Sequence, residues 1–166
     1  MNYAKIKPVD IANGEGVRVS LFVSGCPHRC KGCFNSELWD YDAGQHYNNT
    51  ALVKIMQYCG KNYISGLSLL GGEPLAPENI YDVMPLCYYF KRFYPHKTIW
   101  CYTGYNWEDI KPLAILKYID VLVDGRFIEG LKDPRLKFRG SSNQRIIDVQ
   151  KSLECGEVVL RKDLME

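Results

Sequence analysis

Four short apolar segments, each followed by a polar loop that contains glycine, constrain the fold more than any other feature of this chain. They span residues 17–23, 66–70, 98–102 and 119–124. In the first of them apolar and other side chains alternate, which is typical of a β-strand. Helix-like segments separate the second, third and fourth, and this alternation favours a parallel sheet. A closed eight-fold barrel needs about 250 residues. The 166 residues therefore predict a single α/β domain, 1–166, built as an incomplete βα barrel.

The segments between these strands predict the remaining elements. Residues 1–16 read as an irregular lead-in that ends in a turn. Helices are expected over 51–60, with Asn49 or Thr50 as the N-cap, and over 78–93, where Pro85 should kink or split the helix. Further along we expect a short helix at 107–111 capped by Asn106, a turn at 113–118, and short β-like runs at 146–149 and 157–160.

A cysteine-rich loop follows the first strand. Cys26, Cys30 and Cys33 have C-x3-C-x2-C spacing, and Gly25 and Gly32 allow tight turns around them. Thiolates select zinc, Cu(I) or iron–sulfur clusters. A structural zinc ion needs four closed ligands, and His28 is the only local candidate for the fourth. A four-iron cluster held by three cysteines would instead leave one iron open to a substrate.

Two further loops should lie at the same edge of the sheet, because ligands of α/β folds bind at the carboxyl ends of the strands. Gly71, Gly72 and Glu73 follow the second strand, where carbonyl oxygens and the Glu73 carboxylate could accept hydrogen bonds from an ammonium group. Asp124 and Arg126 follow the fourth strand. They form either a surface ion pair or a ligand contact, since arginine suits carboxylate recognition.

The C-x3-C-x2-C motif followed by an aromatic residue resembles the signature of the radical S-adenosylmethionine (SAM) superfamily. Six stretches bring the resemblance closer, to the anaerobic ribonucleoside-triphosphate reductase activating proteins, over about residues 1–149. They are Asn13–Arg18, Leu21–Cys26, Gly71–Leu75, Tyr102–Tyr105, Val123–Phe127 and Arg139–Arg145.

This resemblance implies a cofactor and a reaction. Cys26, Cys30 and Cys33 would hold a [4Fe–4S] cluster whose open iron chelates SAM. The implied SAM-binding residues are Gly32, Cys33, Phe34, Gly71, Gly72, Glu73, Asp124 and Arg126. Reductive cleavage of SAM would give methionine and a 5′-deoxyadenosyl radical, which abstracts hydrogen from a glycine Cα of the anaerobic reductase. No catalytic side chain is implied beyond the cluster and SAM, and reduced flavodoxin or ferredoxin is the expected electron donor.

Three other functions stay open at this point: activation of a different glycyl-radical enzyme, radical chemistry on a small molecule, and a zinc-stabilised binding module. The formal net charge of +2 gives no electrostatic reason to expect nucleic-acid or membrane partners. The sequence shows no leader and no apolar run of membrane-spanning length, so we expect a cytoplasmic protein.

Two other patterns can be explained without reference to the cysteine loop. A basic run begins after Leu131, and it is either a solvated face or a docking surface for an acidic partner. It comprises Lys132, Arg135, Lys137, Arg139, Arg145 and Lys151. Cys59, Cys87 and Cys101 lie within apolar patterns and are expected to be small buried side chains.

Overall fold

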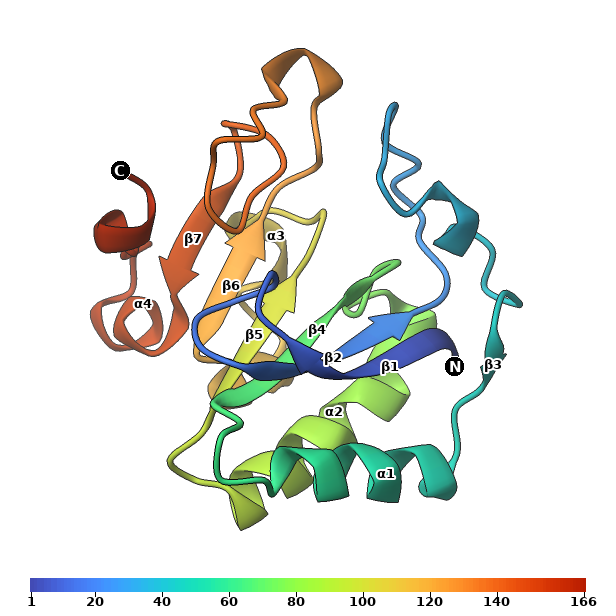
Figure 1. Ribbon diagram of the computed structural model, residues 1–166. Coiled ribbons are helices and arrows are strands. Elements are labelled where there is room, and N and C mark those ends of the chain that lie inside the picture. The colour runs from blue at the N-terminus through green and yellow to red at the C-terminus, as the bar shows by residue number, and fades with distance from the viewer.

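A seven-stranded mixed sheet with helices packed on it forms the framework of the chain (Figure 1). The computed structural model describes residues 1–166. The strands are β1 (Asn2–Asp10), β2 (Arg18–Val23), β3 (Gln45–His46), β4 (Gly66–Gly71), β5 (Thr98–Tyr102), β6 (Val121–Asp124) and β7 (Arg145–Asp148). The α-helices are α1 (Asn49–Cys59), α2 (Pro77–Phe93), α3 (Trp107–Ile110) and α4 (Val149–Cys155). Four 3₁₀ segments are η1 (Ser36–Leu38), η2 (Ala114–Tyr118), η3 (Glu129–Leu131) and η4 (Lys162–Leu164).

The strand order is β3-β1-β2-β4-β5-β6-β7. The central strands β2, β4, β5 and β6 pair in parallel, which confirms the parallel sheet that the βα alternation predicts. β1 pairs antiparallel with β2, and β7 pairs antiparallel with β6. The carboxyl ends of all four parallel strands therefore lie along one edge of the sheet, where their loops can meet.

Residues 2–10 form strand β1, so the prediction of an irregular lead-in is wrong there, whereas residues 11–17 are bends, as the turn signal predicts. β1 shifts register against β2 twice, between Tyr3 and Lys5 and again between Lys7 and Asp10. Such bulges disrupt the period-two pattern by which a strand is recognised in a sequence. The other β predictions need smaller changes: the fourth parallel strand starts at Val121, and segment 157–160 contributes one isolated bridge, between Leu160 and Ile147.

The two long helices lie close to their predicted positions. α1 is capped by Asn48, whose side chain accepts a hydrogen bond from the Ala51 N–H at 3.1 Å, and not by Asn49 or Thr50. α2 continues through Pro85 as one helix. Pro85 has no N–H to donate to the carbonyl of Tyr81, one turn earlier in the helix. Both residues are exposed, so water can bind this carbonyl instead. At α3, Asn106 occupies the N-cap position without a side-chain cap bond.

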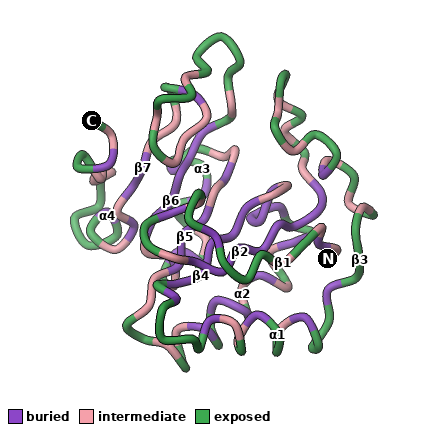
Figure 2. The backbone as a smooth tube through the Cα atoms, in the orientation of Figure 1, coloured by how far each residue is buried: buried purple, intermediate pink, exposed green.

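Both faces of the central strands are covered. Figure 1 shows α1 and α2 on one face, where the main core contains Leu21, Leu67 and Ile99. On the other face Trp100, Val123 and Ile146 form a second cluster. All six residues of β2 are consequently buried, although their sequence alternates like a strand with one wet face (Figure 2). None of the helices is both long and apolar enough to cross a membrane.

Candidate functional site

Loops at the carboxyl ends of all four parallel strands line one cavity of about 390 Å³, to which Thr103 and Gly104 contribute after β5. The cysteine loop leaves β2, the Gly71–Glu73 loop leaves β4, and a long loop over residues 125–144 leaves β6. Figure 1 shows the first and third of them rising from the same edge of the sheet. Leu70 and Tyr102 line the cavity from the sheet itself. The topology thus assembles the site from segments that are more than a hundred residues apart along the chain.

All three motif cysteines contribute to this cavity. Cys26, Cys30 and Cys33 are half-buried free thiols on its wall. Gly25 and Gly32 adopt φ of 93° and 75°, a backbone conformation that favours glycine, and they turn the chain on either side of Cys30. Burial raises the pKa of the Cys26 and Cys30 thiols. A soft metal centre would displace these protons, because thiolates are the ligating form.

The cysteine loop fits an iron–sulfur cluster in the type of ligand and in position. Three thiols open to one space, and the backbone between them is tightly turned. No three His, Cys, Asp or Glu side chains are grouped closely enough to hold a single metal ion. A four-iron cluster does not need that spacing, because each cysteine binds a different iron atom.

The cavity brings together most, but not all, of the residues predicted to contact SAM. Cys33, Phe34, Gly71, Gly72 and Glu73 line it. Three other predicted residues lie outside its wall, namely Gly32, Asp124 and Arg126. Gly32 is exposed on the neighbouring turn, and the Arg126 side chain is exposed to solvent. Arg139, which belongs to the basic run and to the motif stretch Arg139–Arg145 but was not predicted to contact SAM, is the arginine that lines the cavity.

Asp124 is buried in an ion pair with a residue that the sequence analysis did not link to it. Its carboxylate accepts hydrogen bonds from Arg145 at 2.6 and 3.0 Å and from the Trp107 N–H at 2.8 Å. The contacts with Arg145 join β6 to β7. The contact with Trp107 gives the first N–H of α3 an acceptor, in place of the expected cap by Asn106. The hydrogen bond to Asp124 raises the pKa of Arg145, so the guanidinium stays charged. The role that the structure shows for Asp124 is thus to hold elements together.

Glu73 is the centre of a buried hydrogen-bond network. Its side chain is 1% exposed, and His28 Nε2 lies 2.6 Å from Oε1. Thr103 Oγ1 donates to the carboxylate at 2.9 Å, as does the Gly104 N–H at 2.8 Å. The Leu75 N–H donates to the other carboxylate oxygen at 3.0 Å. Groups of the protein therefore already engage both oxygens that were predicted to receive an ammonium group.

His28 reaches Glu73 from within the cysteine motif. The side chain of His28 is 4% exposed, and its ring packs edge-on against Tyr105 at a centroid distance of 4.6 Å. Because Nε2 faces Glu73, that nitrogen is not free to act as a fourth zinc ligand. The contact ties the segment between Cys26 and Cys30 to the loop that follows β4.

Asn79, in the first turn of α2, forms hydrogen bonds to the same two loops. Its amide nitrogen donates to the carbonyl oxygens of Ser24 and Glu73, both at 2.9 Å, and approaches that of Gly25 at 3.4 Å. The Asn79 side chain is buried, and it belongs to none of the motifs that predicted the site. A signal was available, because Asn79 shares the buried stripe of α2 with Val83 and Phe90. A polar residue on an apolar stripe needs buried hydrogen-bond partners.

We expect Asn79→Ala to loosen the cysteine loop. The substitution leaves the Ser24 and Glu73 carbonyls without their amide donor, which costs about 1–3 kcal/mol of unfolding free energy. Chemical denaturation measures this loss, and hydrogen exchange should show faster exchange over residues 24–33. Asn49→Ala is the matched control, since Asn49 is exposed on α1 and makes no side-chain hydrogen bond. Unchanged exchange in the Asn79 variant would contradict this role.

Comparison with known proteins agrees with this site. The family described as "4Fe-4S single cluster domain" matches residues 12–147. The chain is 44% identical over 146 residues to the anaerobic ribonucleoside-triphosphate reductase-activating protein of Enterobacteria phage T4, covering 88% of this chain and 93% of that protein. Proteins of the same name from Haemophilus influenzae and Escherichia coli K12 are 44% and 43% identical over 150 and 148 residues, covering 88% and 87% of this chain and 97% and 96% of theirs. The chain is thus of the single-cluster iron–sulfur class. Within that class, the chain belongs to the family of anaerobic ribonucleoside-triphosphate reductase-activating proteins.

Proposed function

We propose that this chain activates an anaerobic ribonucleoside-triphosphate reductase by generating a glycyl radical on it. Cys26, Cys30 and Cys33 would hold a [4Fe–4S] cluster. When bound, the cluster supplies one electron to the sulfonium of SAM, which gives methionine and a 5′-deoxyadenosyl radical that takes hydrogen from a glycine Cα. The protein partner and the cluster follow from the family to which the chain belongs. The binding of SAM and the radical step go beyond the family description and are our proposal.

One observation carries the proposal: the three cysteines and the Gly71–Glu73 loop line the same cavity at the carboxyl ends of β2 and β4. The cavity is of the size that small cofactors occupy, which is about 300–1,000 Å³. Its floor is apolar, with Leu70, Val123 and Phe138 in the lining. An apolar floor helps to exclude water from a reactive radical.

The residues of this chain would position the reactants, since no acid–base pair is needed. Gly72 lets the backbone of its loop approach that of the cysteine loop, and the Glu73 N–H donates to the Gly25 carbonyl at 2.7 Å. Because Glu73 and His28 bind each other, we assign the amino group of SAM to backbone carbonyls of the glycine loop. Contacts of SAM with Gly32, Phe34, Asp124 and Arg126 remain predictions.

The proposal includes the fold class and the reducing partner. We infer that β2, β4, β5 and β6 are the strands of an incomplete barrel of the radical SAM type, and that residues 1–166 form one domain. Reduced flavodoxin or ferredoxin is the proposed electron donor. Activation of another glycyl-radical enzyme is the second candidate, and the names of the relatives favour the reductase over it. The zinc module has less support, because the family model that matches the chain describes a 4Fe-4S domain.

The decisive experiment uses anaerobically purified protein. We expect a brown protein with about four iron atoms per chain. On incubation with the reductase, SAM and a reductant, a glycyl radical signal should appear in the electron paramagnetic resonance spectrum. Omitting SAM is the control and should abolish the signal. A colourless protein with stoichiometric zinc would overturn the cluster, and an iron-loaded protein that gives methionine without a radical on the reductase would overturn the proposed target.

A further inference from the structure

The mouth of the cavity has an exposed apolar centre beside basic side chains. Phe34, Ile128 and Leu131 are 61%, 45% and 43% exposed. Lys132, Arg135 and Lys137 are exposed on the loop that follows Leu131. We call these six residues the mouth surface. Exposed apolar groups gathered at one place mark interaction sites, and protein interfaces combine an apolar centre with a polar rim.

The two sides of the mouth touch each other at this surface. Phe34, from the cysteine loop, lies 5.1 Å from the ring of Phe127. Lys132 Nζ lies 5.1 Å from the centre of the Phe34 ring, a cation–π contact. Residues of the cysteine loop and of the loop after β6 therefore form one continuous surface, directly outside the space that the three cysteines line.

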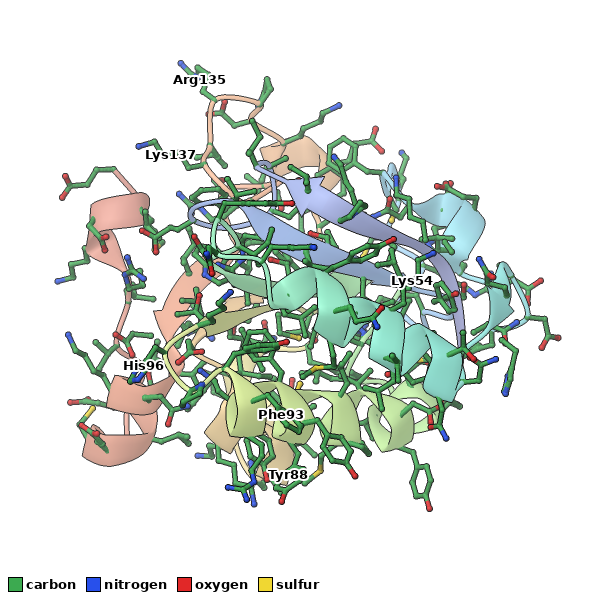
Figure 3. All side chains as sticks on the ribbon, turned by 60° about the horizontal axis from the view of Figure 1, so that its bottom comes forward. Lys54, Tyr88, Phe93, His96, Arg135 and Lys137 are labelled. Atoms are coloured by element: carbon green, nitrogen blue, oxygen red, sulfur yellow. The ribbon has the colours of Figure 1, made fainter.

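The loop over residues 135–138 has two functional faces. Leu136 and Phe138 line the cavity, and the Phe138 ring packs against Trp100 at 5.1 Å. Arg135 and Lys137, which alternate with them, are exposed. Figure 3 shows both of these side chains extending outward from the tip of this loop. A partner bound to the outer face of the loop would thus rest against the wall of the cavity.

We propose that the mouth surface is where the reductase docks, through a polypeptide segment that carries acidic side chains next to apolar ones. This inference rests on the proposed function, in which a backbone glycine of the partner must reach the cavity. Any such segment has to pass the mouth, so its flanking residues meet Ile128, Leu131 and the basic side chains. Residues 126–139 carry five basic side chains against two acidic ones, Glu129 and Asp133, and Asp133 is paired with Arg135 at 2.9 Å, so the loop keeps a net positive charge.

The test is a charge reversal on the outer face of the loop. In Arg135→Glu/Lys137→Glu the affinity for the purified reductase should fall about tenfold at low salt, because rim charges act on encounter and register. The loss should shrink as the salt concentration rises. Lys54→Glu/Lys61→Glu, in and just after α1, makes the same change in net charge and should bind normally, because α1 lies at the opposite end of the molecule from this loop (Figure 1). Ile128→Ala/Leu131→Ala should weaken binding without this salt dependence.

A second measurement separates docking from chemistry. Cleavage of SAM with dithionite and without reductase should stay at the wild-type rate in the Arg135→Glu/Lys137→Glu variant, since neither side chain lines the cavity. Normal reductase affinity in this variant, with wild-type cleavage, would overturn the docking surface and leave the proposed function intact. A change in self-association without a change in reductase affinity would assign the surface to a second copy of this chain. Absence of SAM cleavage in the wild type would refute the proposed function itself.

Discussion

Cys30→Ala should abolish both the brown colour of the protein and the cleavage of SAM. Cys30 is the middle cysteine of the motif, and its thiol lines the cavity with those of Cys26 and Cys33. With one of three thiolates gone, two ligands remain for a cluster that already has one iron without a protein ligand. Iron analysis and the visible absorption spectrum measure the first loss. Release of methionine from SAM measures the second.

Cys155→Ala is the matched control for this experiment. Cys155 is the exposed cysteine at the end of α4 and does not line the cavity, so iron content and SAM cleavage should be unchanged. A Cys30→Ala protein that keeps its cluster and its activity would refute the ligand set. Circular dichroism should show normal secondary structure in both variants, because the cysteine loop lies outside the strands and α-helices.

Gly72→Ala should have the second largest effect. A Cβ at this position would overlap the Gly25 carbonyl oxygen and lie 2.9 Å from the Gly25 carbonyl carbon. Both are backbone atoms of the cysteine loop, so no side-chain rotation relieves the contact. The glycine loop and the cysteine loop must separate, at a cost of about 1–3 kcal/mol. Thermal unfolding measures this cost, and SAM cleavage should fall more steeply because the reactants lose their alignment.

Gly130→Ala provides the comparison for Gly72→Ala. A Cβ at Gly130 would have no atom within 4 Å, and the backbone there does not need glycine, so stability and cleavage should match the wild type. If Gly72→Ala behaved in the same way, the close approach of the two loops would be unimportant for the chemistry.

Much of the framework follows from local pattern. The four strand-like segments and the helices between them predict the parallel centre of the sheet, and the structure confirms it. The antiparallel strands at the two sides were harder to predict. The bulges in β1 disrupt its alternation, and the direction of β7 depends on its pairing with β6. Strand pairing is a long-range property, so the composition of a segment does not determine it.

At the site, the sequence indicated which residues line the cavity more reliably than which side chains they contact. Asp124 and Arg126 were grouped because they are neighbours along the strand, yet Asp124 pairs with Arg145 and Arg126 is exposed. Glu73 was expected to face a ligand, and it binds His28, Thr103 and Gly104. Positions i and i+2 of a continuous strand share a face, but β6 ends at Asp124 and the chain turns at Gly125, where φ is 96°, so Arg126 leaves the direction of the strand.

The sequence by itself determined the motif cysteines, the glycine loop after β4 and the family to which the chain belongs. The tertiary structure decided which side chains hold these loops in place. His28 and Glu73 are 45 residues apart along the chain, and Asn79 reaches Ser24 across 55 residues. Such contacts exist only after β2, β4 and α2 have packed, because buried hydrogen bonds depend on where the fold brings donors and acceptors together. The motif therefore specifies the chemistry of the cysteine loop, and packing specifies its position.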